Sequence, residues 1–475
     1  MPASSTPQPA DRQEMDFAGV FADFSAALTA AALPSEVRRA VKANVLDTLA
    51  CASAGSNAPG VAGVRELVEA WGGAPQAAIW CGARRAPAHH AAWLNGMMAH
   101  ARDYDDTHDA AVLHAGVSVV PAALAAAELR PEATGDDLIS GIAAGLELIC
   151  RLGVATTIGI IDSGFIYSSL FGYFGATVAA ARVLGFDARQ TVNALGIVYS
   201  QAAGTHQVTR DGALTKRMQP GFAAKAALVS VQLAQKDILG ARNTFEGIDG
   251  LFRTYLRGNY DPAILRADLG RRFELMQLSY KPYPCCRFNH TAIDAALAAR
   301  RQPDFDLSRI RRIAVGVNNQ AYEAVCTPPE IRLRPKTIVQ AQFSIPFTVA
   351  CALLDGQVGL GHFTEDGIRR PDILALAEKV ACAVDADIER DWSRAISPTR
   401  LLIEMENINL EERVDYPRGH PAYPMTASDI ETKLEDCLAF GAVDWPPGMN
   451  DRLREAVNGM ERLEQARDIA ALLTR

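Results

Sequence analysis

The sequence lacks the cysteine patterns that mark zinc sites and disulfide frameworks. Its nine cysteines are scattered without metal-ligand spacing, and Cys285 and Cys286 are adjacent, which makes them a poor disulfide pair. A disulfide-stapled secreted domain and a structural zinc module are therefore not expected. The reducing cytoplasm is the compartment that this cysteine usage favours.

The chain also lacks the segments that direct a protein to or across a membrane. Residues 1–15 have no apolar signal-peptide core and are expected to form a disordered leader. No apolar run is expected to reach the roughly 18 residues that span a bilayer, so no membrane partner is predicted. A basic excess is missing too, because the net charge is −8, and this argues against a nucleic-acid partner.

What the chain has is 475 residues, 49% of them hydrophobic, which is enough for two or three domains. Alanine, leucine and valine recur at helical spacing from about residue 17 to 255. Strand patterns follow at 310–318, 380–385 and 400–405. We therefore expect a mainly α fold with an α+β lid: a large all-helical domain over 16–274 and 413–475, and a smaller α/β domain over 275–412.

The most polar stretch of this alanine-rich chain is 94–116, LNGMMAHARDYDDTHDAAVLHAG. It carries three histidines and four aspartates: His100, His108, His114, Asp103, Asp105, Asp106 and Asp109. Burying such a cluster costs stability unless its groups are hydrogen-bonded. On a helix, Asp103, Asp106 and Thr107 would share one face with His100. Carboxylates beside imidazoles suit general acid–base chemistry. A metal site and a purely structural cluster are the alternatives.

A second polar stretch, 205–221, holds Arg210, Lys216 and Arg217 in a glycine-containing loop that runs into a helix. Basic groups beside a helix N-terminus predict an anion-binding site. A solvated basic loop is the alternative interpretation.

Two further stretches could contribute to a site. In 281–290, Lys281 and Arg287 flank a turn that two prolines stiffen, at the point where the domain changes and a cleft is expected. In 164–175, Tyr167 and Ser168 are the groups best placed to handle a proton. Helix packing is the simpler interpretation of this last stretch.

Together, these stretches resemble the MmgE/PrpD family, and the resemblance runs from about residue 17 to 472. The similar motifs are D-Y-D-D-T at 103–107 with a histidine after it, K-R-M-Q at 216–219, K-P-Y-P at 281–284, Q-F-S-I-P at 342–346 and R-G-H-P at 418–421. The family includes 2-methylcitrate dehydratases, cis-aconitate decarboxylases and iminodisuccinate epimerases. The resemblance implies a cofactor-free, metal-free homodimeric enzyme whose small di- or tricarboxylate substrate binds between two domains.

The motif matches carry over Asp103, Thr107, His114, Lys216 and Lys281 as site positions, and the chemistry that these reactions share gives the residues expected roles. A proton is expected to move at a carbon next to a carboxylate, where fixed cations stabilise the developing charge. Lys281 and His114 are the expected proton-transfer groups, Asp103 would orient the histidines, and Thr107 would bond the substrate. The expected substrate-binding residues are Lys216, Arg210, Arg287 and His100.

Three positions depart from the family pattern. Dehydratase- and decarboxylase-like members tend to have histidine where this chain has Ile166 or Tyr167 and Gln219, and decarboxylase-like members have one where Cys286 stands. The first expectation from the resemblance as a whole is a dehydratase-type carbon–oxygen lyase similar to 2-methylcitrate dehydratase, and the missing histidines weigh most against decarboxylation. An epimerase of an iminodisuccinate-like dicarboxylate, with Tyr167 and Lys281 as its two bases, and a cis-aconitate decarboxylase-like enzyme are alternatives. A metal-dependent lyase and a non-catalytic carboxylate-binding protein are rivals from other classes.

Overall fold

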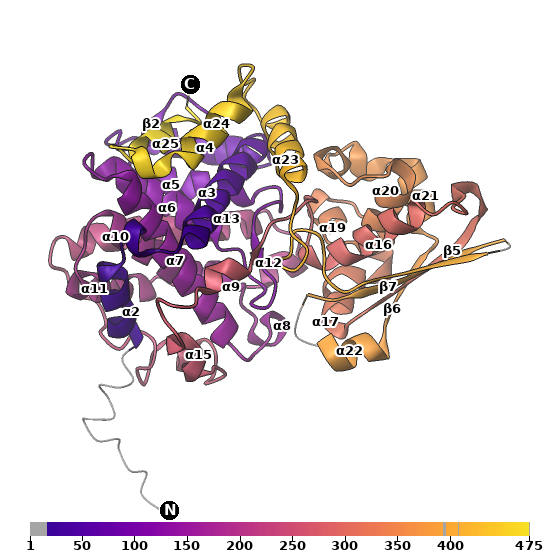
Figure 1. Ribbon diagram of the computed structural model, residues 1–475, viewed down its shortest axis with the longest axis horizontal. Coiled ribbons are helices and arrows are strands. Elements are labelled where there is room, and N and C mark those ends of the chain that lie inside the picture. Colours follow the sequence, from indigo (N-terminus) through magenta and orange to yellow (C-terminus); the bar gives the residue numbers. More distant parts are fainter. Residues whose placement is uncertain (1–16, 393–395, 407, 475) are drawn as a thin grey trace, which may run out of the picture.

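The computed structural model describes residues 17–392, 396–406 and 408–474. Figure 1 shows a large helical body beside a smaller domain that contains a sheet, and the C-terminal helices, in yellow, lie on the large body. The predicted fold class, mainly α with a smaller α/β domain, is confirmed. The predicted disordered leader, 1–15, lies outside the described residues.

The large domain is built from helices that pack closely because they carry many small residues. Gly96 and Gly221 face each other where α5 crosses α13, and a methyl group on Gly221 would lie 2.3 Å from the carbonyl oxygen of Trp93. Only glycine fits that contact. The helices of this part of the chain are α2 (Phe17–Ala27), α3 (Ser35–Gly55), α4 (Val61–Trp71), α5 (Ala88–His100), α6 (Gly116–Leu129), α7 (Gly135–Ala155), α8 (Ile160–Ser163), α9 (Tyr167–Leu170), α10 (Gly172–Val183), α11 (Ala188–Tyr199), α12 (Gln207–Arg210), α13 (Thr215–Ala234), α14 (Leu251–Thr254), α15 (Pro262–Arg266), and the short η1 (Ala30–Ala32) and η2 (Glu274–Gln277).

The large domain also contains two pairs of two-residue strands. In the first pair, β1 (Ala77–Ala78) lies antiparallel to β2 (Arg85–Ala86). In the second, β3 (Thr107–His108) lies antiparallel to β4 (Leu278–Ser279). The second pair matters for function, because it brings the segment that begins with Lys281 beside the polar stretch 94–116.

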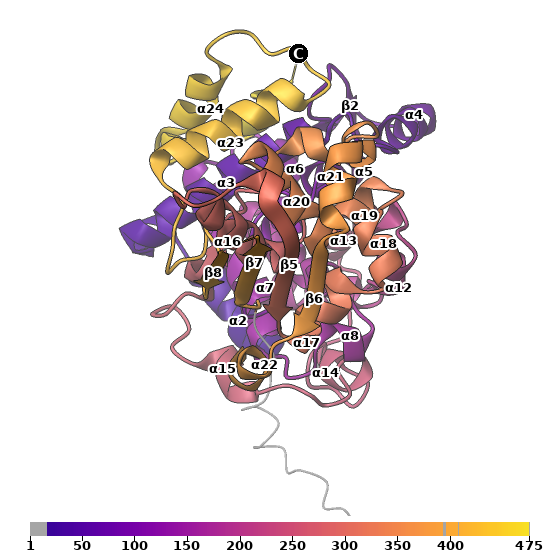
Figure 2. The same cartoon turned by 90° about the vertical axis from the view of Figure 1, so that its right-hand side faces the viewer.

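The smaller domain is a four-stranded sheet with helices packed on it. The strands run in the order β6-β5-β7-β8, with β5 parallel to β6 and the other neighbours antiparallel. Figure 2 shows one face of this sheet toward the viewer, with α16 and α20 behind it. The elements are η3 (Arg287–Asn289), α16 (His290–Arg300), η4 (Leu307–Arg309), β5 (Ile310–Val317), α17 (Asn319–Ala321), η5 (Tyr322–Cys326), α18 (Pro329–Leu333), α19 (Ile338–Gln342), α20 (Ile345–Asp355), η6 (Leu360–Phe363), η7 (Gly367–Arg369), α21 (Pro371–Ala377), β6 (Val380–Val384), α22 (Ala386–Trp392), β7 (Thr399–Met405) and β8 (Asn409–Val414).

The sequence patterns predicted three of these strands and missed β8. Its segment, NLEERV, has charged residues at three of its six positions, and only Leu410 in it is buried. Such a strand lacks the regular alternation of buried and exposed side chains by which a strand is recognised in a sequence. Its charged residues protect the edge of the sheet from pairing with other chains. The strand ends at Val414, just beyond the boundary expected at residue 412.

The C-terminal helices return to the large domain, as the sequence predicted. They are α23 (Ala427–Phe440), α24 (Met449–Asn458), the short η8 (Met460–Arg462) and α25 (Arg467–Ala471). Helices α23 and α24 pack on α3, and α25 packs on α6. Helix α3 is therefore covered on one side by the end of the chain.

One expectation about apolar runs needs correction. Helix α7 is long and apolar enough to span a bilayer by length and composition, although no such run was expected. However, 94% of its 18-residue apolar window is buried inside the protein. Glu147 and Arg151, both fully buried, also form an ion pair within it. Such burial is typical of a core helix.

Candidate active site

The polar stretch does not form the helix face that its spacing predicted. Helix α5 ends at His100, and the chain turns at Asp103, whose φ is +54°. Aspartate tolerates this left-handed conformation better than most residues do. The prediction that Asp103, Asp106 and Thr107 share a helix face was wrong, because the turn points their side chains to different partners.

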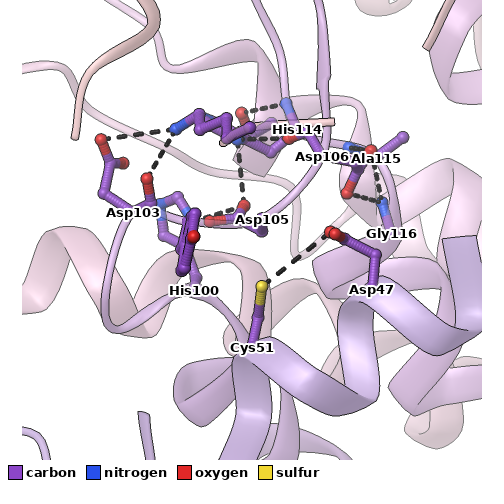
Figure 3. A network of polar contacts seen from close by, with 12 residues as sticks. Asp47, Cys51, His100, Asp103, Asp105, Asp106, His114, Ala115 and Gly116 are labelled. Carbon is purple, nitrogen blue, oxygen red and sulfur yellow. Dashed lines mark hydrogen bonds and ion pairs between the residues drawn. The ribbon is translucent and has the colours of Figure 1, made fainter. Parts of the chain in front are cut away.

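A buried carboxylate, Asp105, holds two of the histidines together. Its Oδ2 lies 2.9 Å from Nδ1 of His100 and 2.9 Å from Nδ1 of His114, and the two imidazole rings meet edge to face (Figure 3). The residue is fully buried. Burial raises the pKa of Asp105, but the two histidines lower it by more, so the carboxyl stays ionised. The orienting role expected of Asp103 therefore falls to Asp105.

A second buried cluster joins Asp103 to two lysines. Lys216 Nζ donates to Asp103 Oδ1 at 2.9 Å, and Lys281 Nζ donates to the Asp103 backbone oxygen at 2.9 Å and lies 3.5 Å from its Oδ2. Burial raises the pKa of Asp103, yet Lys216 and Lys281 bring it well below its usual range. Burial lowers the pKa of Lys281, but Asp103 and Asp105 together raise it above its usual value. Lys281 therefore stays protonated as a counter-ion.

The hydrogen bonds fix where the two histidines carry their protons. Lys216 Nζ, which can only donate, lies 3.2 Å from His100 Nε2, so this nitrogen accepts and His100 is neutral. Burial lowers the pKa of His100 to about 4, in spite of Asp105. His114 Nδ1 also donates to the backbone oxygen of Asp106 at 2.7 Å, which leaves Nε2 of His114 as its free nitrogen. His114 is therefore the imidazole that can exchange a proton with a substrate.

The remaining aspartate of the motif, Asp106, caps a helix. Its carboxylate accepts hydrogen bonds from the backbone of Ala115 at 3.1 Å and Gly116 at 3.0 Å, at the start of α6. The positive end of the helix dipole favours a carboxylate there. Burial raises the pKa of Asp106 to about 6, with Asp105 and Asp47 adding to the rise.

A cavity of about 280 Å³ opens beside these groups, and residues of both domains line it. From the large domain, it is lined by His100, Asp103, Thr107, His114, Arg210 and Lys216, and from the smaller domain by Arg287, Phe288, Arg332 and Phe343. The structure therefore brings together six of the predicted site residues from the large domain and one from the smaller domain. A cleft between domains is a common place for a ligand site.

The cations at the cavity differ in how free they are. Arg287 makes a bidentate ion pair with Asp109, 3.0 Å at each contact, and its Nη1 donates to the Arg418 backbone. The guanidinium of Arg210 has no hydrogen bond or ion pair within the described ranges. Lys216 uses two of its three protons on Asp103 and His100, which leaves one for a ligand. Arg210 and Lys216 are thus available to a carboxylate, and Arg287 is largely committed.

Two predicted proton-transfer residues do not line the cavity. The hydroxyl of Tyr167 donates to the backbone oxygen of Ile158 at 2.6 Å, and burial raises the pKa of Tyr167 to about 12. Lys281 is fully buried behind Asp103. The geometry therefore supports neither residue as a base toward a substrate, although Lys281 keeps a role in holding Asp103.

Two cavity residues were missed by the sequence predictions. His206 lies in a stretch already singled out for its basic residues, and its imidazole Nδ1 is buried with no hydrogen-bond partner in the described part of the chain. Arg332 donates from Nε and Nη2 to backbone oxygens of Thr327 and Ala324. The position of His206 close to Arg210 was the one sequence feature that could have indicated it as a cavity residue. No sequence feature indicated Arg332.

The fold and site can be compared with known proteins. The MmgE/PrpD N-terminal domain matches residues 19–263, and the MmgE/PrpD C-terminal domain matches residues 283–444. The chain belongs to the MmgE/PrpD family. Among relatives of this MmgE/PrpD protein, the cis-aconitate decarboxylase-like protein oryM of Aspergillus oryzae is 26% identical over 460 residues, 93% of each chain. The cis-aconitate decarboxylase of Aspergillus terreus is 28% identical over 463 residues, 93% of this chain and 92% of the relative. That of Homo sapiens is 25% identical over 401 residues, 82% of this chain and 79% of the relative.

This MmgE/PrpD site lacks histidines at positions where the family pattern predicted them, and a histidine from a neighbouring loop lies close to one of these positions. Ile166 and Cys286, which stand where histidines were expected, both line the cavity. However, the backbone N–H of Ile166 donates to Gly204 at 2.8 Å, so the loop that carries His206 lies directly against it. An imidazole from the neighbouring loop therefore stands in the same wall of the cavity.

The histidine pair also meets the distance criteria for a metal site in this MmgE/PrpD protein. One ligand atom each of His100, Asp105 and His114 lies within 4.8 Å of the others. The contacts are hydrogen bonds, because 2.9 Å separates nitrogen from oxygen and both Nδ1 atoms carry protons. Zinc would bind these nitrogen atoms only without their protons. The ammonium of Lys216, 3.2 Å from His100, also disfavours a dication.

The buried histidines make the stability of the MmgE/PrpD fold sensitive to acid. Burial lowers the pKa of His89, His100 and His206 from 6.5 to about 4. Between pH 6.5 and pH 4, these histidines bind protons in the unfolded chain but stay neutral in the folded chain. The free energy of unfolding therefore falls as the pH falls. We expect the free energy of unfolding in urea to drop across this window, with His100 contributing up to about 3 kcal/mol. The slope should be smaller in His100→Gln, and equal stability at pH 6.5 and pH 4 would contradict the assignment.

Proposed function

We propose that this protein is a cofactor-independent lyase that moves a proton at a carbon next to a carboxylate of a small di- or tricarboxylate. The observation that carries the proposal is that one cavity holds a free imidazole nitrogen, Nε2 of His114, together with Arg210 and with Lys216, which keeps one proton for a ligand. Cations bind the carboxylates and stabilise the charge that builds up on them, and the imidazole transfers the proton.

Each remaining group of the cavity has a supporting part in this proposal. The hydroxyl of Thr107 makes no hydrogen bond to the described residues and can bond the substrate. His100 holds Lys216 in place through its Nε2. Asp105 keeps the proton of His114 on Nδ1, which is how a carboxylate sets the reactive nitrogen of a catalytic histidine. Arg332 adds positive charge from the smaller domain.

Among specific reactions, decarboxylation of an unsaturated tricarboxylate such as cis-aconitate is the one we place first. The relatives that span most of this chain carry that name. His206 also supplies an imidazole beside the position where one was expected and not found. Dehydration of a 2-methylcitrate-like substrate, which needs the same groups, is the second candidate. Epimerisation has less support, because Tyr167, its expected second base, points away to Ile158.

Nuclear magnetic resonance with a panel of acids in deuterated buffer tests the proposal. The panel contains cis-aconitate, 2-methylcitrate and an aspartate-like dicarboxylate. Loss of CO2 with one deuterium incorporated in the product would show decarboxylation. A new alkene formed without CO2, seen as a vinyl proton or as the methyl doublet of 2-methylcitrate turning into a singlet, would show dehydration. Exchange without net reaction would show an epimerase. If none of the acids reacts or exchanges, the proposed function is wrong.

The free guanidinium of Arg210 leads to a prediction about substrate binding. We expect Arg210→Ala to raise KM by about 10- to 100-fold while kcat changes only a few-fold, because a hydrogen bond to a charged group contributes about 1.5–3 kcal/mol. Steady-state kinetics measure both constants. Arg189→Ala, which removes an exposed arginine of α11 outside the cavity, is the matched control. Equal KM values for the two variants would contradict the role of Arg210.

The homodimer and the cytoplasmic location expected from the sequence stay predictions. Light scattering during size-exclusion chromatography and fractionation of cells measure them directly.

A further inference from the structure

A cluster of buried polar side chains from α3 and the polar motif, which we call the chamber, lies at the start of α6. Thr48 Oγ1, and Asp105 Oδ1 of the neighbouring motif, are buried and have no hydrogen-bond partner among the described residues, and Asn44 lies next to the hydroxyl of Tyr280. Buried polar atoms are almost always bonded, either to protein or to enclosed water. The side chains of Asn44 and Thr48 reach the same point as Asp106 Oδ1, and enclosed water would satisfy the atoms that protein groups leave unpaired.

The chamber requires a glycine at the start of α6. A methyl group on Gly116 would lie 2.6 Å from Asn44 Oδ1, 2.7 Å from Thr48 Oγ1 and 2.8 Å from Asp106 Oδ1. These three oxygens, from α3 and from the polar motif, therefore converge on the first residue of α6. Asn44 and Thr48 are four residues apart and share a face of α3 with Asp47. In Figure 3, Asp47 rises from α3 toward the loop that carries Asp105 and Asp106.

The carboxylates of the chamber lack the cations that their neighbours have. Lys216 and Lys281 pair with Asp103, and Lys433 of α23 pairs with Asp47 at 2.5 Å. Neither Asp105 nor Asp106 has a lysine or arginine partner within the described ranges. A buried carboxylate without a cation stays ionised only if hydrogen bonds satisfy its oxygens.

The structure assigns Asn44 and Thr48 as positioning residues. Through enclosed water, they keep the carboxylates of Asp105 and Asp106 ionised beside the histidine pair. The negative charge of these carboxylates in turn keeps a proton on His114 for the reaction. The inference rests on the proposed function, in which His114 transfers a proton. It adds two residues of α3 that touch neither the cavity nor a substrate.

The charge behind His114 matters because the reaction needs an acid. In a decarboxylation, the bond from carbon to the leaving carboxylate breaks, and its electron pair passes into the carbon skeleton. CO2 then leaves, and His114 gives its Nε2 proton to a carbon of the skeleton. One solvent proton replaces it before the next turnover. Ionised carboxylates nearby stabilise the protonated imidazole that does this.

Other charged groups face the same chamber and bear on its electrostatics. Asp106, with its pKa of about 6, is the carboxyl most easily neutralised if its hydrogen bonds are lost. The titratable groups packed around the chamber and the pair are Asp47, Cys51, His100, Asp103, Cys150, Lys216, Tyr280, Lys281 and Lys433. Thr48→Val removes no contact that the structure gives these groups, whereas Asn44→Leu would also remove the contact between Asn44 and Tyr280.

The test compares Thr48→Val, which removes the hydroxyl at nearly constant volume, with Thr48→Ser, which keeps it. Two quantities are measured for each: the pH profile of kcat with cis-aconitate, and the pH at which the ring protons of His114 titrate in the substrate-free protein, assigned by comparison with His114→Gln. We expect Thr48→Val to move both toward lower pH by about one unit, with about tenfold lower kcat on the alkaline side and unchanged KM. Thr48→Ser should behave as the wild type. Asn44→Leu serves as the second variant if Thr48→Val does not fold.

Each outcome decides the inference. Identical pH profiles for Thr48→Val and the wild type would overturn the inference. Equal losses of kcat in Thr48→Val and Thr48→Ser, together with a higher KM, would also overturn it, because they would show that Thr48 has only a structural role. The titration of His114 needs no turnover. A shifted titration in a protein that converts none of the acids would therefore reject the proposed function and retain the positions of Asn44 and Thr48.

Discussion

Replacing His114 by asparagine is expected to lower kcat by about 10²- to 10⁴-fold, which is the range over which a positioned acid–base group contributes. The asparagine amide can still donate to the Asp106 backbone oxygen, as His114 Nδ1 does at 2.7 Å. It cannot carry a proton at the position of Nε2. The loss should therefore fall on kcat and only weakly on KM, because the cations that bind the carboxylates are unchanged. Steady-state kinetics with the best acid of the panel measure the effect.

The control for this variant is Val112→Ala, which alters the same cavity without touching a proton-carrying group. We expect it to keep activity within a few-fold of the wild type. Urea unfolding of both variants checks that the fold is intact. If His114→Asn retained more than a tenth of the wild-type kcat, another group would have to transfer the proton, and His206, with its unpartnered Nδ1, would be the next to test.

The sequence was sufficient to predict most of the polar residues that line the cavity, and insufficient to show how they are held. Asp103 and Asp105 stand two residues apart in one motif, and their spacing cannot tell which one orients the histidines. The answer depends on the left-handed φ at Asp103, which turns Asp103 to the lysines and Asp105 to the imidazoles. No glycine or proline between His100 and Thr107 announced the turn.

Residues that reach the cavity from distant segments were harder to predict. His206 enters because its loop pairs with the segment before Tyr167, and Arg332 enters from the other domain. Tyr167 was expected to act as a base, yet a nearby backbone oxygen at Ile158 takes its hydroxyl away from the cavity. The helices, three of the four strands of the smaller domain and the return of the C-terminus followed local patterns, and these the sequence did predict. Contacts across the fold have no local pattern.

Neutralising Asp103 is expected to cause the largest loss of stability. Asp103→Asn removes the negative charge that Lys281, fully buried, and Lys216, 8% exposed, share. Removing one partner of a buried ion pair costs about 3–5 kcal/mol, because the other partner is left charged and unpaired. Asparagine is the right replacement, since it tolerates the φ of +54° at this position, where alanine or leucine would add about 1–2 kcal/mol of backbone strain. Urea unfolding at pH 7 measures the free energy of unfolding.

A double variant separates the charge from other effects of the substitution. Lys281→Met alone should cost less than Asp103→Asn, because Asp103 keeps Lys216 at 2.9 Å. If the unpaired ammonium of Lys281 causes the loss, then Asp103→Asn combined with Lys281→Met should be more stable than Asp103→Asn alone, although it carries one more substitution. Additive losses would show that the two groups do not depend on each other. In that case Lys281 would be free of Asp103, and its assignment as a counter-ion rather than a base would have to be given up.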